Sequence, residues 1–140
     1  MEEIEVGDYV RTVDGVIANV DYIEKIEYIS KHKVEKTYCF DKTIYYEYED
    51  AIYFLLEDEL DKYITKHSPN IIDLIEVGDY VNGYKVIDVM EDMQTGELHL
   101  EMPMDYTNQE KGDCTIYNKN IKSIVTKEQF QNVQYTIKED

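Results

Sequence analysis

Residues 4–10, which read Ile-Glu-Val-Gly-Asp-Tyr-Val, recur without change as residues 75–81. Seven identities in seven positions are far beyond chance in a chain of 140 residues, and such a repeat indicates that one folding unit was copied. A weaker match aligns residues 60–66 with residues 121–127, near the end of each copy. We therefore expect an internal duplication, with both copies adopting the same fold.

The repeat predicts a first unit at residues 1–68 and a second at residues 69–140. Pro69 lies at the joint, where it has no N–H to donate and biases Ser68 towards extended backbone. Each unit is small, and a domain of about 60 residues buries only about 60% of the surface that its unfolded chain exposes. Because the joint is short and lacks a Gly/Ser-rich linker, we expect the two units to be closely coupled.

Short strands and tight turns are predicted in both units. Asp14-Gly15 and Asn82-Gly83 are typical of hairpin turns. Alternation of apolar and polar residues predicts a strand with one face formed by Val16, Ala18, Val20 and Tyr22. Further strands are expected at residues 43–48, 98–102, 115–117 and 133–137. Such a unit resembles a small SH3-like barrel, so the expected fold is mainly β, with two tandem SH3-like units.

Residues 50–64 are compatible with a helix or with two strands. Their apolar residues have helical spacing, with acids on the other side: Ile52, Leu55, Leu56, Leu60, Tyr63 and Ile64. The aligned residues 113–126 contain a turn signal, Asn118-Lys119-Asn120, between two β-like runs. We therefore favour a strand, a turn at residues 57–59 and a second strand, and keep the helix as the alternative. Residues 127–130 are expected to form one helical turn, and the expected core comprises Val10, Ile17, Ile64, Val81, Val86, Ile124 and Phe130.

Two stretches of the chain carry a family resemblance. Residues 67–86 read His-Ser-Pro-Asn-Ile-Ile-Asp-Leu-Ile-Glu-Val-Gly-Asp-Tyr-Val-Asn-Gly-Tyr-Lys-Val, and residues 122–130 read Lys-Ser-Ile-Val-Thr-Lys-Glu-Gln-Phe. Both look like recurring segments of small, acidic, uncharacterised proteins encoded by phages and prophages of Gram-positive bacteria. The resemblance covers most of the second unit and the start of the first. Its motifs are turn glycines and strand residues, so it implies a phage setting and carries over no catalytic residue.

The acidic balance of the chain restricts its partners. Fourteen basic and 31 acidic residues give a net charge of −17. This charge argues against direct binding to nucleic acid, where Lys and Arg must neutralise phosphates, and against anionic membrane surfaces. No apolar run is long enough to cross a membrane, and the acidic start does not resemble a signal peptide. We expect a protein of the host cell cytoplasm, with Cys39 and Cys114 as free thiols.

The sequence shows no catalytic or metal-binding pattern. His32, His67 and His99 are isolated from one another and lack the spacing of a zinc site. No serine has the context of a nucleophile elbow, and the six glycines all read as turn residues rather than as a phosphate-binding loop. We therefore expect a protein that is not an enzyme and that binds no metal or cofactor.

Acidic and tyrosine residues cluster in the middle of the first unit. The expected partner-binding residues are Glu47, Glu49, Asp50, Tyr53, Glu57, Asp58, Glu59 and Asp61. A looser cluster comprises Asp88, Glu91, Asp92, Glu97, Glu101 and Asp105. Either cluster is explained by a solvated acidic surface. The alternative is a surface in which carboxylates replace phosphates and pair with Arg and Lys of a nucleic-acid-binding groove.

These observations favour a phage-encoded binding protein that inhibits a host nucleic-acid-handling defence enzyme. An anti-CRISPR or anti-restriction role fits this description, and Cas nucleases, which hold DNA in positively charged channels, are natural targets. Two alternatives remain open. The chain could be an adaptor or structural module of a phage, or a protein that sequesters a small molecule.

Overall fold

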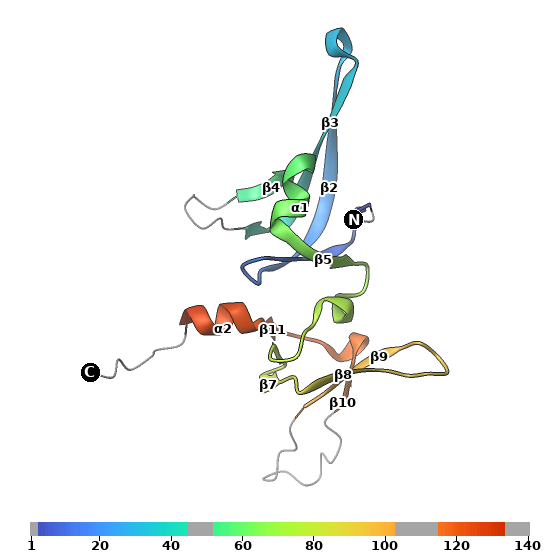
Figure 1. Cartoon of the computed structure of the whole chain (residues 1–140), viewed down its shortest axis with the longest axis vertical. Helices are drawn as coiled ribbons and strands as arrows, with labels where there is room; N and C mark the ends of the chain where they lie inside the picture. Colours follow the sequence, from blue (N-terminus) through green and yellow to red (C-terminus); the bar gives the residue numbers. More distant parts are fainter. Residues whose placement is uncertain (1–2, 45–51, 103–114, 134–140) are drawn as a thin grey trace, which may run out of the picture. The chain divides into compact units, whose positions relative to one another are not determined.

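The computed structural model describes residues 3–44, 52–102 and 115–133, in two compact units, Met1–Leu74 and Ile75–Asp140 (Figure 1). The predicted joint at Ser68 lies inside the first unit, because a short 3-10 helix, η3 (Ile71–Leu74), follows and packs against the first strand. The buried Arg11 side chain donates a hydrogen bond from Nη1 to the Leu74 carbonyl at 2.9 Å. This bond ties the end of the first unit to its sheet.

The first unit contains one antiparallel sheet of five strands, in the order β4-β3-β2-β1-β5. Its strands are β1 (Tyr9–Thr12), β2 (Ile17–Tyr28), β3 (Lys33–Ile44), β4 (Ile52–Leu56) and β5 (Ile64–Ser68). The long β2–β3 hairpin projects beyond the rest of this unit and closes through η1 (Ile29–Lys31) (Figure 1). His32 follows with φ +49°, in the left-handed region that ends this turn.

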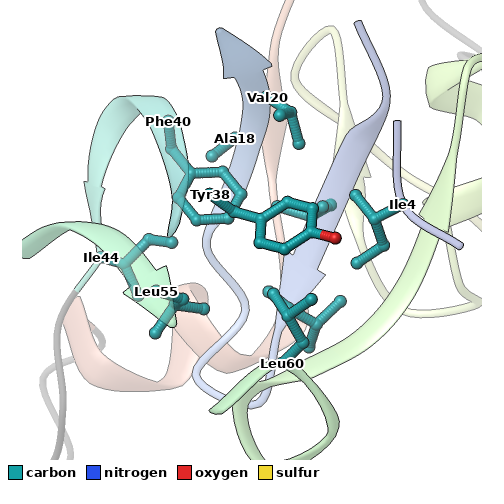
Figure 2. Packing of buried hydrophobic residues seen from close by; sticks show 10 residues of the cluster. Ile4, Ala18, Val20, Tyr38, Phe40, Ile44, Leu55 and Leu60 are labelled. Carbon is teal, nitrogen blue, oxygen red and sulfur yellow. The ribbon is translucent and has the colours of Figure 1, made fainter. Parts of the chain in front are cut away.

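The core of the first unit lies against one face of this sheet. Figure 2 shows Tyr38 and Phe40 of β3 among aliphatic side chains that include Ile4, Leu55 and Leu60. The cluster is completed by Val10, Ala18, Val20, Ile44 and Ile64. Burial of these side chains supplies the main driving force for folding of the unit.

A β-bulge changes the facing of side chains halfway along β2. Val20 pairs with Phe40 and Tyr22 pairs with Cys39, so Asp21 is an extra residue with no counterpart on β3. Val20 before the bulge is buried, whereas Tyr22 after it is 57% exposed. The predicted single face of Val16, Ala18, Val20 and Tyr22 is therefore wrong at Tyr22, because one extra residue reverses the alternation.

In the ambiguous segment, the favoured strand and the turn at residues 57–59 are confirmed over residues 52–59, but the second strand begins only at Ile64, because residues 60–63 form a helical turn. β4 leads into the 3-10 helix η2 (Glu57–Glu59), then a single helical turn, α1 (Leu60–Tyr63), and then β5. The helical spacing of the apolar residues is satisfied only in α1, where Leu60 is buried in the core. Residues 45–51 lie outside the described residues, as does part of the predicted strand 43–48.

The second unit contains two small antiparallel sheets. One has the order β11-β6-β7, from β6 (Tyr80–Val81), β7 (Tyr84–Lys85) and β11 (Ile124–Val125). The other has the order β10-β9-β8, from β8 (Asp88–Glu91), β9 (Leu98–Glu101) and β10 (Thr115–Tyr117). A 3-10 helix, η5 (Asn118–Asn120), occupies the predicted turn, and α2 (Lys127–Val133) follows β11.

The hairpin turns differ between the two units. Asn82 and Gly83 have φ +53° and +86° and join the paired residues Val81 and Tyr84, which is the two-residue hairpin that Asn-Gly predicts. In the turn between β1 and β2 of the first unit, Gly15 has a positive φ of +83° and Asp14 does not, and the two strands are joined by the longer connection 13–16. Asp14-Gly15 therefore forms a wider turn than expected.

A mainly β structure with antiparallel sheets is confirmed. The described strands form three sheets, and none of these closes into a barrel. Among the expected core residues, Val10, Ile64, Val81 and Val86 are buried, and Ile17 and Ile124 are half-buried.

The core prediction for Phe130 is wrong. The side chain is 36% exposed and its ring stacks on that of Tyr80. It belongs to α2, which continues past the single turn predicted at residues 127–130 and places Phe130 against the surface of the sheet. Val133 ends this helix rather than starting a strand, and residues 134–137 lie outside the described residues.

The repeated segment forms the same hydrogen-bonded turn in both units. Gly7 and Gly78 have φ +92° and +99°, values that L side chains rarely adopt, so glycine is required at both positions. The Gly7 N–H donates to Val20 and the Gly78 N–H donates to Val86, both at 2.9 Å. The two glycines therefore occupy equivalent turns.

Candidate partner-binding surface

The predicted acidic and tyrosine cluster is only partly described. Glu47, Glu49 and Asp50 lie outside the described residues. Tyr53 belongs to β4 and is 62% exposed. Glu57, Asp58 and Glu59 form η2, and Asp61 lies on α1. The turn between β4 and β5 thus brings four of the predicted acids together.

Glu59 has a structural role within this acidic turn. Its Oε1 accepts a hydrogen bond from the Leu56 N–H at 3.0 Å, across the start of η2. A carboxylate at this position satisfies a backbone donor that the short helix leaves free. Glu57, Asp58 and Asp61 are exposed. Among the described acids of the predicted cluster, these three are therefore accessible to a partner, and their substitution should cost the fold little stability.

Lysines of β3 lie beside the acidic turn. A hollow of about 300 Å³ is lined by residues that include Lys33, Lys36, Leu56, Glu57 and Asp58. The Lys36 Nζ lies 3.3 Å from Glu3 Oε1, which raises the pKa of the ammonium group, and Glu57 adds to this effect. The acidic turn is consequently not a uniformly negative surface, because part of its field is neutralised by β3.

The sheet carries an outward face that the sequence analysis did not identify. Cross-strand pairing places Tyr22, Cys39 and Phe54 in one row and Glu24, Thr37 and Leu56 in the next. Ile26 with Glu35, and Tyr28 with Lys33, continue this face towards the hairpin end. We call the side chains of Tyr22, Ile26, Tyr28, Phe54 and Leu56 the outer face. The signal in the sequence is that Tyr22, Ile26 and Tyr28 lie at even positions like Val20, whereas Ile23 lies at an odd position.

The second acidic cluster lies on the β8–β9 hairpin of the second unit. Asp92 Oδ1 accepts the backbone N–H groups of Thr95 and Gln94 at 3.0 and 2.8 Å, and these bonds lower the pKa of the carboxyl group. Asp92 therefore shapes the turn. Asp88, Glu91 and Glu97 are exposed, Glu101 is half-buried, and Asp105 lies outside the described residues.

Another hollow, of about 630 Å³, lies beside the opening turn of the first unit and is lined by residues that include Glu3, Glu5, Asp8, His67 and Asp73. His67 Nδ1 lies 3.3 Å from Asp8 Oδ2, and the Ser68 hydroxyl donates to Asp73. Asp8 Oδ2 also accepts the Glu5 N–H at 3.1 Å. These polar groups bind one another and the backbone, so these contacts of His67 are structural.

The His, Cys, Asp and Glu side chains of the described ranges include no group of three or more that could hold a metal ion. Cys39 is a free thiol, and Cys114 lies outside the described residues. Within the part of the chain that the structure describes, no helix is both long and apolar enough to cross a membrane.

No protein-family model, curated protein or solved structure matches this chain. The resemblance to phage proteins stays a prediction, and the surface described above is the basis for assigning a function.

Proposed function

We propose that this chain is a non-enzymatic, phage-encoded binding protein that inhibits a nucleic-acid-handling defence enzyme of its host. The supporting observation is the surface of the first unit, where Glu57 and Asp58 follow directly on the exposed aromatic strand β4. Carboxylates beside aromatic rings suit a groove whose Arg and Lys side chains normally bind phosphates, since both groups interact with guanidinium. A Cas nuclease in the host cytoplasm is the proposed target class.

The two units are proposed to descend from one duplicated SH3-like module. The support is the matched turn at residues 4–10 and 75–81, with glycine and aspartate in the same roles. In this proposal the second unit is the shorter version of the module. The first unit is longer in its middle, in the region that includes the acidic turn.

The test of the inhibitor function is DNA cleavage by a purified, guide-loaded Cas9-type nuclease from a Gram-positive host. The wild-type chain is expected to block cleavage. The triple substitution Glu57→Gln, Asp58→Asn and Asp61→Asn is expected to weaken inhibition about tenfold, as three exposed ion pairs of about 0.5 kcal/mol each would allow. Glu59 is left unchanged because it caps η2.

A matched control removes three exposed acids from the second unit through Asp88→Asn, Glu91→Gln and Glu97→Gln. This control variant removes the same amount of negative charge as the triple variant and is expected to inhibit like the wild type. Equal loss of inhibition in both variants would show that only total charge matters. Absence of inhibition by the wild-type chain against any nuclease of this class would refute the proposal.

The adaptor alternative has its own support in the exposed apolar side chains of the outer face. Apolar docking depends weakly on ionic strength, whereas contacts between carboxylates and Arg or Lys weaken steeply as salt rises. The salt dependence of binding to a purified partner therefore separates the two functions. Sequestration of an anionic nucleotide is disfavoured, because the hollow of about 630 Å³ is lined by several carboxylates.

A further inference from the structure

The outer face is an exposed apolar surface whose continuity follows from strand register. Tyr22 is 57% exposed, Phe54 48%, Ile26 42%, and Tyr28 and Leu56 39% each. On the opposite side of the same strands, Ile23, Tyr38 and Leu55 share a row, and Tyr38 and Leu55 are buried in the core. The sheet thus presents apolar side chains on both faces, although it packs a core on only one.

The pattern along β2 shows that this exposure is built into the sheet. Without the bulge at Asp21, Tyr22 would continue the inward row of Ala18 and Val20. The bulge turns Tyr22 outward, beside Phe54 through the shared neighbour Cys39. Bulges of this kind re-aim side chains and are over-represented next to functional sites.

Charge around the outer face defines the chemistry of its partner. Glu24 and Glu35 lie on the face itself, and Glu57 and Asp58 adjoin Leu56. Asp21 and Glu24 lie near enough to add to the raised pKa of Tyr22, whose main cause is a hydrogen bond with Cys39. The described lysines at this surface are Lys33, opposite Tyr28, Lys31, 5.9 Å above the Tyr28 ring, and Lys36, beside Leu56 and Glu57. Acids outnumber these lysines, so a complementary surface is basic.

A second copy of this chain is a poor occupant of the same face. Each copy has a net charge of −17, and bringing two acidic rims together adds repulsion to the cost of association. A basic partner gains attraction instead, which speeds encounter and selects against acidic competitors.

We propose that the outer face binds a protein whose complementary surface is apolar at its centre and rich in Lys and Arg around it. Tyr22 and Phe54 provide the central contacts, and the acids steer the encounter. Exposed aromatic side chains that become fully desolvated at the centre of an interface commonly dominate its affinity. The inference rests on the proposed function only for the identity of the partner, since it assigns the contact surface whichever basic protein is bound.

The first experiment measures binding of the full chain to the purified, guide-loaded Cas9-type nuclease. The double variant Tyr22→Ser and Phe54→Ser is expected to bind at least tenfold more weakly, mainly through faster dissociation. The matched control is Tyr84→Ser on β7, an aromatic residue that is 47% exposed in the second unit, and its affinity should stay within twofold of the wild type. Thermal unfolding of both variants verifies that their folds are intact.

The outcomes separate this inference from the function on which it rests. If the wild type inhibits the nuclease and the double variant inhibits equally well, the outer face is not the contact surface and the inference is overturned. The proposed function then stands on the acidic turn alone. Loss of affinity in the double variant, together with slower association at high salt, supports the inference.

If the nuclease is not bound, a photoreactive benzoylphenylalanine replaces Tyr22 in the chain produced in host cells, with Tyr84 replaced in the control. A cross-linked basic protein supports the inference if, once purified, it binds the wild type and loses at least tenfold in affinity to Phe54→Ser. Cross-linking to a second copy of the chain, to an acidic protein, or equally at both positions overturns it, as does no cross-linking at position 22.

Discussion

The opening turns of the two units have the same sequence but different partners. In the first unit, Asp8 Oδ2 accepts the Glu5 N–H at 3.1 Å and lies 3.3 Å from the ring of His67. In the second, Asp79 Oδ2 accepts the Glu76 N–H at 2.7 Å, and its Oδ1 accepts the Lys127 N–H at 2.9 Å. The repeat specifies the turn itself, and the chain that returns to it determines what the aspartate binds next.

Strand register gives the same result. Val10 pairs with His67 of β5, whereas the matching Val81 pairs with Ile124 of β11. The sequence alignment of residues 60–66 with 121–127 places Ile124 opposite Tyr63, four residues before His67. Identical local sequence is therefore a better guide to a turn than a similar sequence is to the pairing of a distant strand.

The largest difference is expected between the two aspartates. Asp79→Ala leaves two backbone N–H groups without their carboxylate in a fully buried position, and should destabilise the second unit by about 2–4 kcal/mol. Asp8→Ala removes one such bond and should cost the first unit about 1–2 kcal/mol. Hydrogen exchange of backbone amides in the full chain reports each unit separately. Equal losses of stability in the two units would mean that the aspartate contributes equally to both turns despite its different partners.

The two glycines should respond alike. Gly7→Ala and Gly78→Ala place a Cβ at φ +92° and +99°, at an expected cost of about 1–2 kcal/mol each. Space does not distinguish them, because a Cβ at Gly7 meets nothing within 4 Å and one at Gly78 meets the Lys127 side chain at 3.6 Å. Urea unfolding of both variants checks this. A clearly larger loss at Gly78 would show that the contact with Lys127 is tighter than an ordinary one.

Phe130 lies on α2 and stacks on Tyr80 within the second unit. Its ring centroid lies 4.6 Å from that of Tyr80, with the side chain 36% exposed. Phe130→Ala should cost about 1 kcal/mol, in the range of a stacked aromatic pair, rather than the roughly 3–5 kcal/mol of a fully buried ring. Thermal unfolding measures the change. A loss above 3 kcal/mol, roughly what a core Phe gives, would contradict the exposed position.

The smallest effect concerns like charges in the second unit. Asp88 faces Glu101 across the β8–β9 pair, and like charges directly opposite each other destabilise a sheet. Asp88→Lys should stabilise this hairpin by about 0.2–1 kcal/mol. Glu91→Lys is the control, since Glu91 faces Leu98. Equal stabilisation by both variants, measured by denaturant unfolding, would attribute the gain to net charge rather than to the facing pair.

Local chemistry made several parts of the structure predictable. The Asn82-Gly83 hairpin follows from two positive φ angles that few residues adopt. The turn at Glu57–Glu59 follows from comparison with the turn signal at residues 118–120 of the second unit. Features that depend on a single extra residue or on one side-chain bond were not predictable. The bulge at Asp21 has no signature in the residue types of β2. Glu59 cannot be told from its acidic neighbours in the sequence, because its role depends on the hydrogen bond that it accepts from the Leu56 N–H in the folded chain.

The candidate site was predictable to the same extent. Its exposed acids Glu57, Asp58 and Asp61 were visible as a charge cluster. The outer face was not, because its members come from β2 and β4 and are brought together only by their common pairing with β3.

The bulge at Asp21 has a consequence for how this protein can diversify. It lets β2 hold one extra residue while the pairing on both sides of that residue stays regular. Deletion of Asp21 would make Tyr22 follow Val20 directly, and is expected to leave Tyr22 outward, opposite Cys39, and Ile23 inward, opposite Tyr38. Unchanged solvent accessibility of Tyr22 in such a deletion variant would confirm this. One codon can therefore be gained or lost here without changing which side chains the first unit presents to its surroundings, so the length of β2 can vary while both folding and recognition stay intact.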